Sequence, residues 1–416
     1  MLRHGPARAA RHAPAGRLGG LALLSEGRFR ALLASTGASD LATAMRVAAQ
    51  SWLVLELTDS SLWVGAVAGV RAVPAVLLAL VGGVVTDRVD KRALLFVSRL
   101  VLGFAAAAIG LLVAWGQIHP WHLVLLSVAG GVVIAFHGPA LWALVGDLVP
   151  GRGLASANGL MALTYNVGDM AGPAVAGAVI AGAGTEVAFW AIGGGYGGAA
   201  LLLIALAPQR RPASLPAASI LRDLRDGLSY ARRTQPLPWL CILIAVTSVF
   251  GVAVFPLIPT YARDILDVGA SGYGLLAGAL GAGALAGAVA ISAFGNHPRK
   301  GLVIVLSGVV WDAGMIGFGF SRVFPLSLAL LFVMGAAGAY WMNAAVTAFL
   351  SVAGPAMRGR VMGLYVLAAE FFPLGWLYGG ALASAVGNEW ALVISACGGT
   401  PVTLLAYALS PDLRRV

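Results

Sequence analysis

Gly83-Val-Val-Thr-Asp-Arg-Val-Asp-Lys-Arg92 is a short charged loop at the junction of two long apolar runs, Ser61–Thr86 and Ala93–Trp115. Each run is long enough to cross a bilayer, because a transmembrane helix needs about 20 mostly apolar residues. Three residues of the loop are basic, and Lys and Arg collect in the cytoplasmic loops of membrane proteins. The stretch therefore predicts a hairpin of two antiparallel membrane-spanning helices with its connecting loop in the cytoplasm.

The composition of the whole chain also indicates a membrane protein. Of its 416 residues, 59% are hydrophobic and 11% are charged, whereas a soluble globular protein carries about 25% charged residues. A soluble enzyme of this length would need far more polar surface. The 56 glycines fall mostly within apolar stretches, where small residues let helices approach closely. We therefore predict an all-α integral membrane protein.

Beyond the first hairpin, the chain divides into about twelve apolar spans of membrane-crossing length. In the N-terminal half the expected spans are Arg30–Leu57, Ser61–Thr86, Ala93–Trp115, Trp121–Asp147, Leu154–Ala183 and Glu186–Ala207. In the C-terminal half they are Trp239–Ala262, Ser271–Phe294, Gly301–Ser321, Pro325–Ser351, Gly359–Ser384 and Trp390–Leu409. The expected domains are a disordered cytoplasmic tail over 1–29, a six-helix bundle over 30–207, a linker over 208–238, a second six-helix bundle over 239–410 and a cytoplasmic tail over 411–416.

The basic residues are divided unevenly between the two sides of these spans. A net charge of +10 could suggest a nucleic-acid partner, but such proteins cluster Lys and Arg on one soluble face. Here the cations lie in the loops of one side, while the opposite loops hold only Arg263 and Arg322. The positive-inside rule then places both termini in the cytoplasm and excludes nucleic acid as the explanation of the charge.

The segment 208–238 interrupts the pattern of spans. Its stretch Ser219–Arg233 places apolar residues such as Ile220 and Leu224 on one helical face and arginines elsewhere. Such an amphipathic helix lies on the cytoplasmic leaflet of the membrane. A simple tether between the two bundles is compatible with the same sequence.

The two halves of the chain repeat each other's signals. The fifth and eleventh spans are entered by similar stretches, Pro150–Gly159 and Pro355–Gly363, and both then carry a proline among small residues. Signals that recur after about 200 residues indicate a duplicated six-helix unit. Two parallel repeats around a cavity at the membrane midplane are a transporter architecture that works by rocking one half against the other.

The loop 83–92 resembles the signature of the major facilitator superfamily, Gly-x-x-x-Asp-Arg-x-x-(Arg/Lys)-(Arg/Lys). The matching residues are Gly83, Asp87, Arg88, Lys91 and Arg92. Asp90 stands where the family usually has glycine, and an ordinary basic loop is the plainer interpretation. The spacing within a twelve-span frame favours the family.

The resemblance implies a cytoplasmic gate. Asp87 is expected to meet the N-terminus of the eleventh helix near Arg358, where the helix dipole favours a carboxylate. Asp147 and Arg99 are expected to join the same salt-bridge gate, through Arg88 or Arg92.

The fifth span is similar to the antiporter motif of drug exporters. The matching residues are Gly159, Gly168, Gly172, Pro173 and Gly177, with Ala176 in place of one glycine. Glycine removes side-chain bulk and proline bends a helix, so the motif allows close packing; generic packing of small residues is the alternative. This resemblance favours export over uptake. Essentially the whole chain after Arg28 also resembles the branch of the superfamily that contains macrolide efflux proteins and the enterobactin exporter.

Ionisable residues inside spans are functional candidates, because burying them in a membrane is costly. Asp40 and Arg46 lie in the first span, with Gln50 one turn after Arg46. Asp40 and Arg46 are six residues apart and so lie on different stripes of the helix. The resemblance implies that the first helix lines the central cavity and that its acidic groups carry the coupling proton; a structural pairing of Asp40 with a neighbouring helix is the alternative.

Further candidates lie in the fifth and eleventh spans. Asp169 within the antiporter motif and Glu370 in the eleventh span are expected to take part in proton coupling or substrate binding, although a structural pairing with an arginine is the alternative for Glu370. The residues expected to line the cavity are Trp52, Asn166, Phe371, Phe372 and Trp376.

The fourth span lacks an element that many drug–proton antiporters of the superfamily share. That element is Arg-x-x-x-Gly, but here the span reads Ser127-Val-Ala-Gly-Gly131. The familiar proton relay through that arginine therefore cannot be transferred to this chain. Arg46 and Arg71 are candidates either to replace it or to bind an anionic substrate, and the sequence leaves both possibilities open.

The leading hypothesis is a secondary transporter that exports a bulky amphipathic compound, such as a drug or a siderophore, in exchange for protons. It is expected to act as a monomer in the bacterial cytoplasmic (inner) membrane, with membrane lipid around it. A lysophospholipid transporter or flippase of the same fold is the alternative, in which Arg46 would bind head groups. A membrane enzyme is a further alternative, but the sequence shows no catalytic set, metal cluster or cofactor site, and no phosphate-binding Gly-x-x-x-x-Gly-Lys-Ser/Thr loop of an ATP-driven pump.

Overall fold

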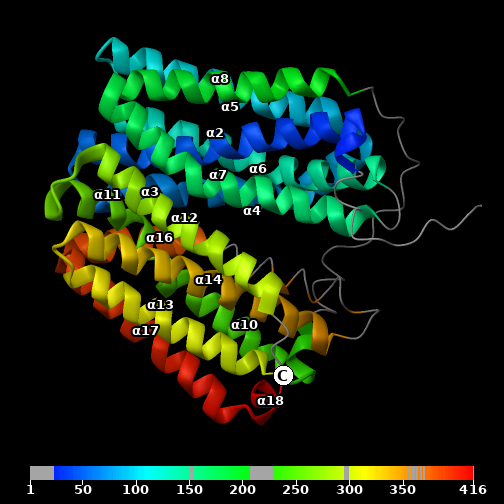
Figure 1. Ribbon diagram of the computed structural model, residues 1–416, viewed down its shortest axis with the longest axis vertical. Coiled ribbons are helices and arrows are strands. Elements are labelled where there is room, and N and C mark those ends of the chain that lie inside the picture. Colours follow the sequence, from blue (N-terminus) through cyan, green and yellow to red (C-terminus); the bar gives the residue numbers. More distant parts are fainter. Residues whose placement is uncertain are drawn as a thin grey trace, which may run out of the picture.

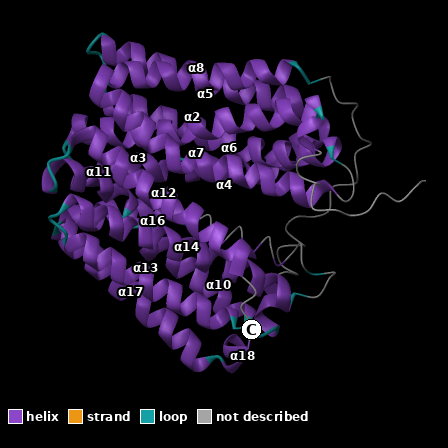
Figure 2. Ribbon diagram, in the orientation of Figure 1, coloured by secondary structure: helices purple, strands orange, loops and turns teal. Residues whose placement is uncertain are grey.

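The computed structural model describes residues 23–149, 153–206, 228–294, 299–353 and 371–415, together with the single residues 357, 361, 364, 365 and 368. Every regular element in this part of the chain is a helix (Figure 2). Nine of its helical segments are long and apolar enough to cross a membrane. The predicted all-α membrane fold is therefore confirmed.

Helices make up the N-terminal half of the described chain. They are α2 (Gly27–Thr58), α3 (Ser61–Val70), α4 (Ala72–Arg88), α5 (Lys91–Ala114), α6 (Pro120–Leu148), α7 (Leu154–Ala183) and α8 (Thr185–Ile204). Helices α3 and α4 follow each other with only Arg71 between them and together form the second predicted span.

The C-terminal half begins with an irregular span. Its pieces are α10 (Leu237–Val246), η2 (Thr247–Gly251), η3 (Phe255–Leu257), α11 (Ile258–Thr260) and η4 (Tyr261–Ile265). Two of them, η2 and η4, are π-helical turns. The predicted span Trp239–Ala262 is thus observed as a broken helix, because Pro256 and Pro259 each lack the backbone N–H that a regular helix needs.

The remaining helices match the later predicted spans. They are α12 (Gly269–Phe294), α13 (Lys300–Phe320), α14 (Phe324–Val352), α16 (Phe372–Val386) and α17 (Asn388–Leu409). The short helix α18 (Pro411–Arg415) follows in the predicted tail. Most of the first half of the predicted eleventh span, Gly359–Ser384, lies outside the described residues. With α2, α7 and α16 added to the nine apolar segments, the observed helices are consistent with twelve spans.

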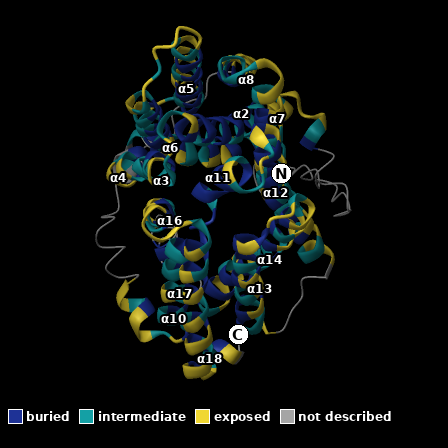
Figure 3. Ribbon diagram, turned by 90° about the vertical axis from the view of Figure 1, so that its left-hand side faces the viewer, coloured by how far each residue is buried: buried dark blue, intermediate teal, exposed yellow. Residues whose placement is uncertain are grey.

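The helices form two bundles, one from each half of the chain (Figure 1). The bundles pack on each other mainly through α7 with α12 and α3 with α16. Figure 3 looks along the helices and shows α3, α11, α12 and α16 between the bundles. Large apolar side chains such as Leu77, Phe104 and Leu201 are exposed, as expected of surfaces that face lipid.

The duplication predicted from the sequence is visible in the backbone. The turn before α8 holds Gly184 at φ 99° and ψ 161°, and the turn before α17 holds Gly387 at φ 89° and ψ 160°. The first and seventh spans are each followed by an aspartate with positive φ, Asp59 at 50° and Asp267 at 52°. Both pairs lie on the side away from the basic loops, which we call the opposite side; the side of the basic loops is the basic side.

The contact between the halves is repeated in the same way. A Cβ atom on Gly177, seven residues before Gly184, would collide with the Ala270 carbonyl and with Gly274. A Cβ atom on Gly380, seven residues before Gly387, would collide with the Ser61 carbonyl and with Gly65. The same backbone-to-backbone contact thus occurs once at α7–α12 and once at α3–α16, and both copies lie near the opposite side.

Several predicted boundaries fall on residues that the structure does not describe. These are residues 1–22 of the predicted tail and residues 207–227, which include most of the predicted linker and its amphipathic helix. The division into domains stays a prediction at those positions. Within the described residues, α2 begins at Gly27 and α10 at Leu237.

Candidate functional site

A buried polar network connects α2 to α6. Arg46 Nη1 donates a hydrogen bond to Gln50 Oε1 over 2.9 Å. Gln50 Nε2 in turn donates to the Leu123 carbonyl over 2.8 Å and to Ser127 Oγ over 2.6 Å. Arg46 and Gln50 are each only 4% exposed. Their spacing of four residues places both side chains on one face of α2, so the helix presents an oriented cation to its neighbours.

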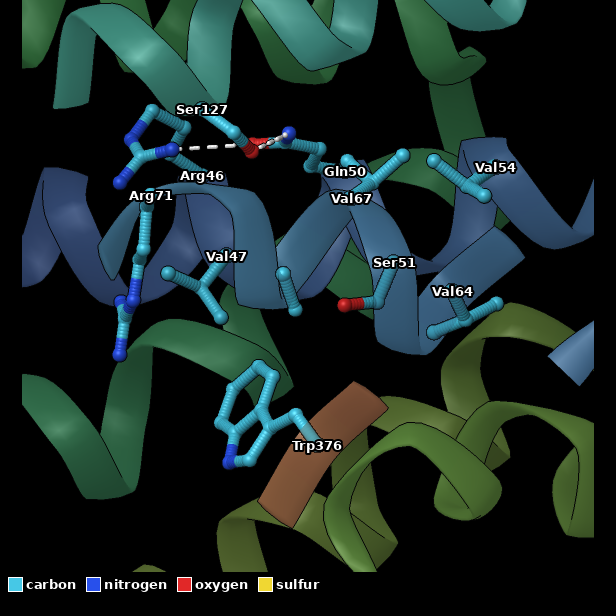
Figure 4. A pocket seen from close by; sticks show the side chains of 11 residues that line it. Arg46, Val47, Gln50, Ser51, Val54, Val64, Val67, Arg71, Ser127 and Trp376 are labelled. Carbon is cyan, nitrogen blue, oxygen red and sulfur yellow. Dashed lines mark hydrogen bonds between the residues drawn. The ribbon is translucent and has the colours of Figure 1, made fainter. Parts of the chain in front are cut away.

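This network lines a small pocket at the contact between the two halves (Figure 4). Trp376 of α16 reaches the pocket from the C-terminal half, and Arg71 lies between α3 and α4 in the N-terminal half. The guanidinium carbon of Arg71 lies 5.3 Å from the centre of the Trp376 ring, a distance at which the cation is attracted to the ring face. Valine side chains, among them Val47 and Val64, make up much of the remaining wall.

The fourth-span element without arginine packs against arginines from other elements. A Cβ atom on Gly130 would lie 3.4 Å from Arg46 Nη2, and one on Gly131 would collide with the Arg71 backbone carbonyl. A cation therefore does lie beside this part of α6, but α2 supplies it. The sequence could name Arg46 as a candidate replacement, yet only the packing of α2 on α6 brings it there.

Asp40 faces a different neighbour from Arg46. Thr164 Oγ1 of α7 lies 3.0 Å from Asp40 Oδ2 and donates to it, while the same hydroxyl is 2.8 Å from the Met161 carbonyl. The side chain of Asp40 is partly buried. The structure thus directs Asp40 toward α7 and Arg46 toward α6, in agreement with their six-residue spacing.

The antiporter motif on α7 packs on two helices. A Cβ atom on Gly168 would lie 3.0 Å from the Asp40 main chain, and one on Gly172 would meet Ala44, so both glycines pack on α2. Gly177 packs on α12, and the Pro173 carbonyl lies against Gly274. A side chain on Gly159 would meet nothing within 4 Å in the described part of the chain. Four of the five matching residues therefore lie in tight contacts.

The other candidate residues on α7 and α16 are exposed, partly buried or bonded to their own helix. Asp169 is exposed, and Asn166 Nδ2 donates back to the Ala162 carbonyl of its own helix over 2.7 Å. Phe371 is exposed and Phe372 is partly buried, at the start of α16. Glu370 lies outside the described residues.

Trp52 is placed where the two halves meet. Its ring stacks on Tyr273 of α12 with 5.8 Å between ring centres, and its indole N–H donates to Glu56 over 2.6 Å. It is only 5% exposed, so in this state the residue is part of the contact between the halves.

The expected gate residues form ion pairs and hydrogen bonds within the N-terminal half. Lys91 Nζ lies 2.5 Å from Asp147 Oδ2. Arg92 donates to the Leu203 and Ile204 carbonyls over 2.8 and 3.0 Å, where a cation is favoured by the C-terminal end of α8. Asp147 was predicted to pair with Arg88 or Arg92, but it pairs with Lys91 instead.

Arg99 also differs from its predicted place in the gate. It is 1% exposed and donates to Ser35 Oγ and, over 3.2 Å, to the Ala199 carbonyl. It therefore connects α5 to α2 and α8 inside the N-terminal bundle. Gly83 and Asp87 lie on α4, but the side chain of Asp87 and all of Arg358 are outside the described part of the chain; Arg88 is exposed.

Residues on the opposite side that the sequence did not single out connect the two halves. Arg263 of η4 donates to the Leu55 carbonyl over 3.1 Å and pairs with Asp59, both in the N-terminal half. Ser61 Oγ lies 3.0 Å from Thr260 Oγ1 across the same boundary. The available signal was that Arg263 is one of only two cations on an otherwise acidic side.

Residues 18–412 match the family described as transmembrane secretion effector, within the major facilitator superfamily. The chain is a member of this family. The match covers nearly the whole chain, including both bundles and the candidate site. The protein is therefore a multi-pass membrane transporter and not an enzyme.

Curated relatives of this transporter are exporters by name. The multidrug efflux pump Tap of Mycolicibacterium fortuitum is 26% identical over 86% of this chain and 88% of its own length. Macrolide efflux protein A of Streptococcus pyogenes is 21% identical over 88% and 92%. The enterobactin exporter EntS of Citrobacter koseri is 25% identical over 88% and 84%. The transporter thus belongs to the drug and siderophore exporter branch.

A solved structure supports the fold. A bacterial homologue of the human lysosomal transporter Spinster, in an inward-facing and unoccupied conformation, superposes with a TM-score of 0.75. The two chains are 13% identical, and the match covers 96% of this transporter and 99% of that chain. The major facilitator fold expected from the sequence is confirmed.

Proposed function

We propose that this transporter exports a bulky amphipathic organic compound across the bacterial cytoplasmic membrane by alternating access, in exchange for protons. The observation that carries the proposal is the polar pocket at the contact between the halves, formed by Arg46, Gln50 and Ser127 from one half and Trp376 from the other. A site built from both halves is exposed to one side or the other when the halves rock. The relatives named as drug, macrolide and siderophore exporters support the direction of transport.

The proposed orientation places both termini and the basic side in the cytoplasm. Lys91, Arg92 and Lys300 lie at helix ends on that side, as the positive-inside rule requires. In this proposal the glycine contacts and Arg263 close the outer side in an inward-facing state. Asp87 and Arg358 are proposed to close the cytoplasmic side in the alternate state.

Asp40 is the proposed proton carrier among the described residues. It lies on the same helix as Arg46, and within the described part of the chain it accepts a hydrogen bond from the neutral hydroxyl of Thr164. A carboxyl group with a neutral partner can lose and regain a proton without breaking an ion pair. Asp169 and Glu370 are the further candidates for the same role.

The proposal is tested with purified monomeric protein in liposomes under an imposed pH gradient. Lumenal pH is recorded while macrolides, catecholate siderophores and lysophospholipids are added one at a time. We expect one class of compound to trigger proton flux and Asp40→Asn to abolish its dependence on the gradient, with Asp412→Asn as a control outside the membrane.

Two outcomes of the same liposome assay would contradict the proposal. Lysophospholipid that crosses regardless of the gradient, with no proton flux for any compound, would replace the proposal by a lipid flippase. Proton flux that keeps its full gradient dependence in Asp40→Asn would move the carrier to Asp169 or Glu370.

A further inference from the structure

Arg46 is a buried cation that donates to a neutral side chain. It is 4% exposed, and its hydrogen bond goes to the Gln50 amide oxygen. Its Nε atom is buried and has no hydrogen-bond partner among the described residues. None of the ion pairs in the described part of the chain involves Arg46. A buried charge without a counter-ion is costly, so this arrangement is suited to receive one.

The walls around Arg46 carry positive charge and apolar surface. Among the described residues, those that line the pocket include the two cations Arg46 and Arg71 and no carboxylate. Ser51 and Ser127 add hydroxyl groups, while valines and the ring of Trp376 supply the apolar wall (Figure 4). A ligand that fits this lining has an anionic group joined to an apolar body.

The orientation of Arg46 is fixed by its neighbours. Gln50 is held by the Leu123 carbonyl and by Ser127, and it holds Arg46 Nη1 in turn. The absence of a side chain at Gly130 leaves space beside the guanidinium. Nε belongs to the edge through which a guanidinium binds an oxyanion with two parallel hydrogen bonds.

We propose that this pocket selects substrates with an anionic oxygen group, such as a carboxylate, a phosphate or an ionised catechol, and that Arg46 binds that group. Arg71 and Trp376 hold the adjoining part of the substrate, and the valines contact its apolar body. This inference rests on the proposed export function and specifies its substrate class. Because Trp376 belongs to the other half, a bound substrate touches both halves at once.

The test compares two fluorescent probes that differ only in charge. Binding of pyrenebutyrate and of the neutral pyrenebutanol is measured on the full transporter in nanodiscs of zwitterionic lipid. We expect Arg46→Gln to weaken pyrenebutyrate binding by at least about tenfold and to leave pyrenebutanol binding within about twofold. Arg46→Lys, which keeps the charge but loses the fork, is expected to fall between the two.

Controls separate binding from folding. Arg322→Gln removes an exposed arginine of the C-terminal half that pairs with Glu389, and it is expected to bind both probes as the unaltered protein does. Should Arg46→Gln fail to elute as folded protein, Gln50→Leu tests the same prediction by removing the group that orients Arg46. Equal losses for the charged and neutral probes in a folded variant would overturn the inference.

Competition identifies the source of the anion. Displacement of pyrenebutyrate by lysophosphatidic acid but not by lysophosphatidylcholine would indicate a lipid head group, and displacement by free amphipathic acids alone would indicate a soluble substrate. If neutral compounds are exported in exchange for protons, and Arg46→Gln does not change the preference between anionic and neutral compounds, this inference would be overturned and the proposed function would stay intact. Arg46-dependent binding of the anionic probe without proton-driven export would overturn the proposed function and leave this inference intact.

Discussion

The two interfaces between the halves have the same packing and different chemistry. At α7–α12 and at α3–α16, a glycine seven residues before a glycine turn lies against a backbone carbonyl and a second glycine. Beside α3–α16 lies the pocket with Arg46, Arg71 and Trp376, whereas the groove beside α7–α12 is lined by apolar residues such as Met170, Leu275 and Phe332. Duplication of the six-helix unit accounts for the glycine contact that the two interfaces share. Later divergence of the two copies accounts for the polar pocket that lies beside α3–α16 and not beside α7–α12.

The strongest test of the shared closure fills each glycine contact in turn. Gly177→Leu and Gly380→Leu each force a side chain into a backbone carbonyl, and overpacking of this kind costs about 1–3 kcal/mol or more. We expect each variant to lower transport by at least about tenfold and to increase the distance between spin labels placed across the opposite side. Gly159→Leu, in the same motif but in open space, is the matched control.

If the two interfaces are equivalent, Gly177→Leu and Gly380→Leu should agree within about twofold. A large loss in one and normal transport in the other would show that only one contact closes the outer side.

The difference between the interfaces is tested at Trp376. Trp376→Leu removes the ring beneath Arg71, and a cation–π contact contributes about 0.5–2 kcal/mol. We expect the KM of transport to rise about two- to tenfold with kcat little changed, because the contact holds substrate and not the gate. Phe332→Leu in the apolar groove is the counterpart and is expected to leave KM unchanged. A KM that rises equally in both variants would mean that both interfaces bind substrate.

The smallest effect is expected at the ion pair on the opposite side. Arg263→Gln removes the pair with Asp59 and the bond to the Leu55 carbonyl. Because Asp59 is largely exposed, the contribution is about 0.2–1 kcal/mol. We expect a shift of up to about fivefold toward the outward-open state, measured by the labelling rate of a cysteine in the outer half of the contact.

Arg322→Gln provides the comparison for Arg263→Gln. Arg322 pairs with Glu389 inside the C-terminal half, so its loss should leave the labelling rate unchanged. An equal change in both variants would show that general surface charge, and not a bond between the halves, controls this state.

The sequence predicted helices better than contacts. The bounds of α7 were predicted at Leu154–Ala183 and are observed there, with Gly153 and Gly184 directly outside its two ends. The seventh span was predicted from its hydropathy, which does not register the prolines and π-helical turns that break its helix.

Partners across the fold were less predictable than spacing along a helix. The four-residue spacing of Arg46 and Gln50 could be read directly, whereas the bond from Gln50 to Ser127 depends on how α2 and α6 are rotated. The same reason explains why Asp147 was expected beside Arg88 or Arg92 and is found with Lys91. Arg263 was missed as a functional residue because nothing in its local sequence marks its partner in the other half.

The repeated glycine turns also bear on how the chain was assembled in evolution. The largest contacts between the two halves join the fifth span of one half to the second span of the other, twice. A pair of identical half-length chains would satisfy this arrangement without any new contact, since each copy carries both surfaces. The geometry is therefore that of a symmetric homodimer within a single chain, in which one of the two equivalent seams lies beside a pocket with arginines and the other does not.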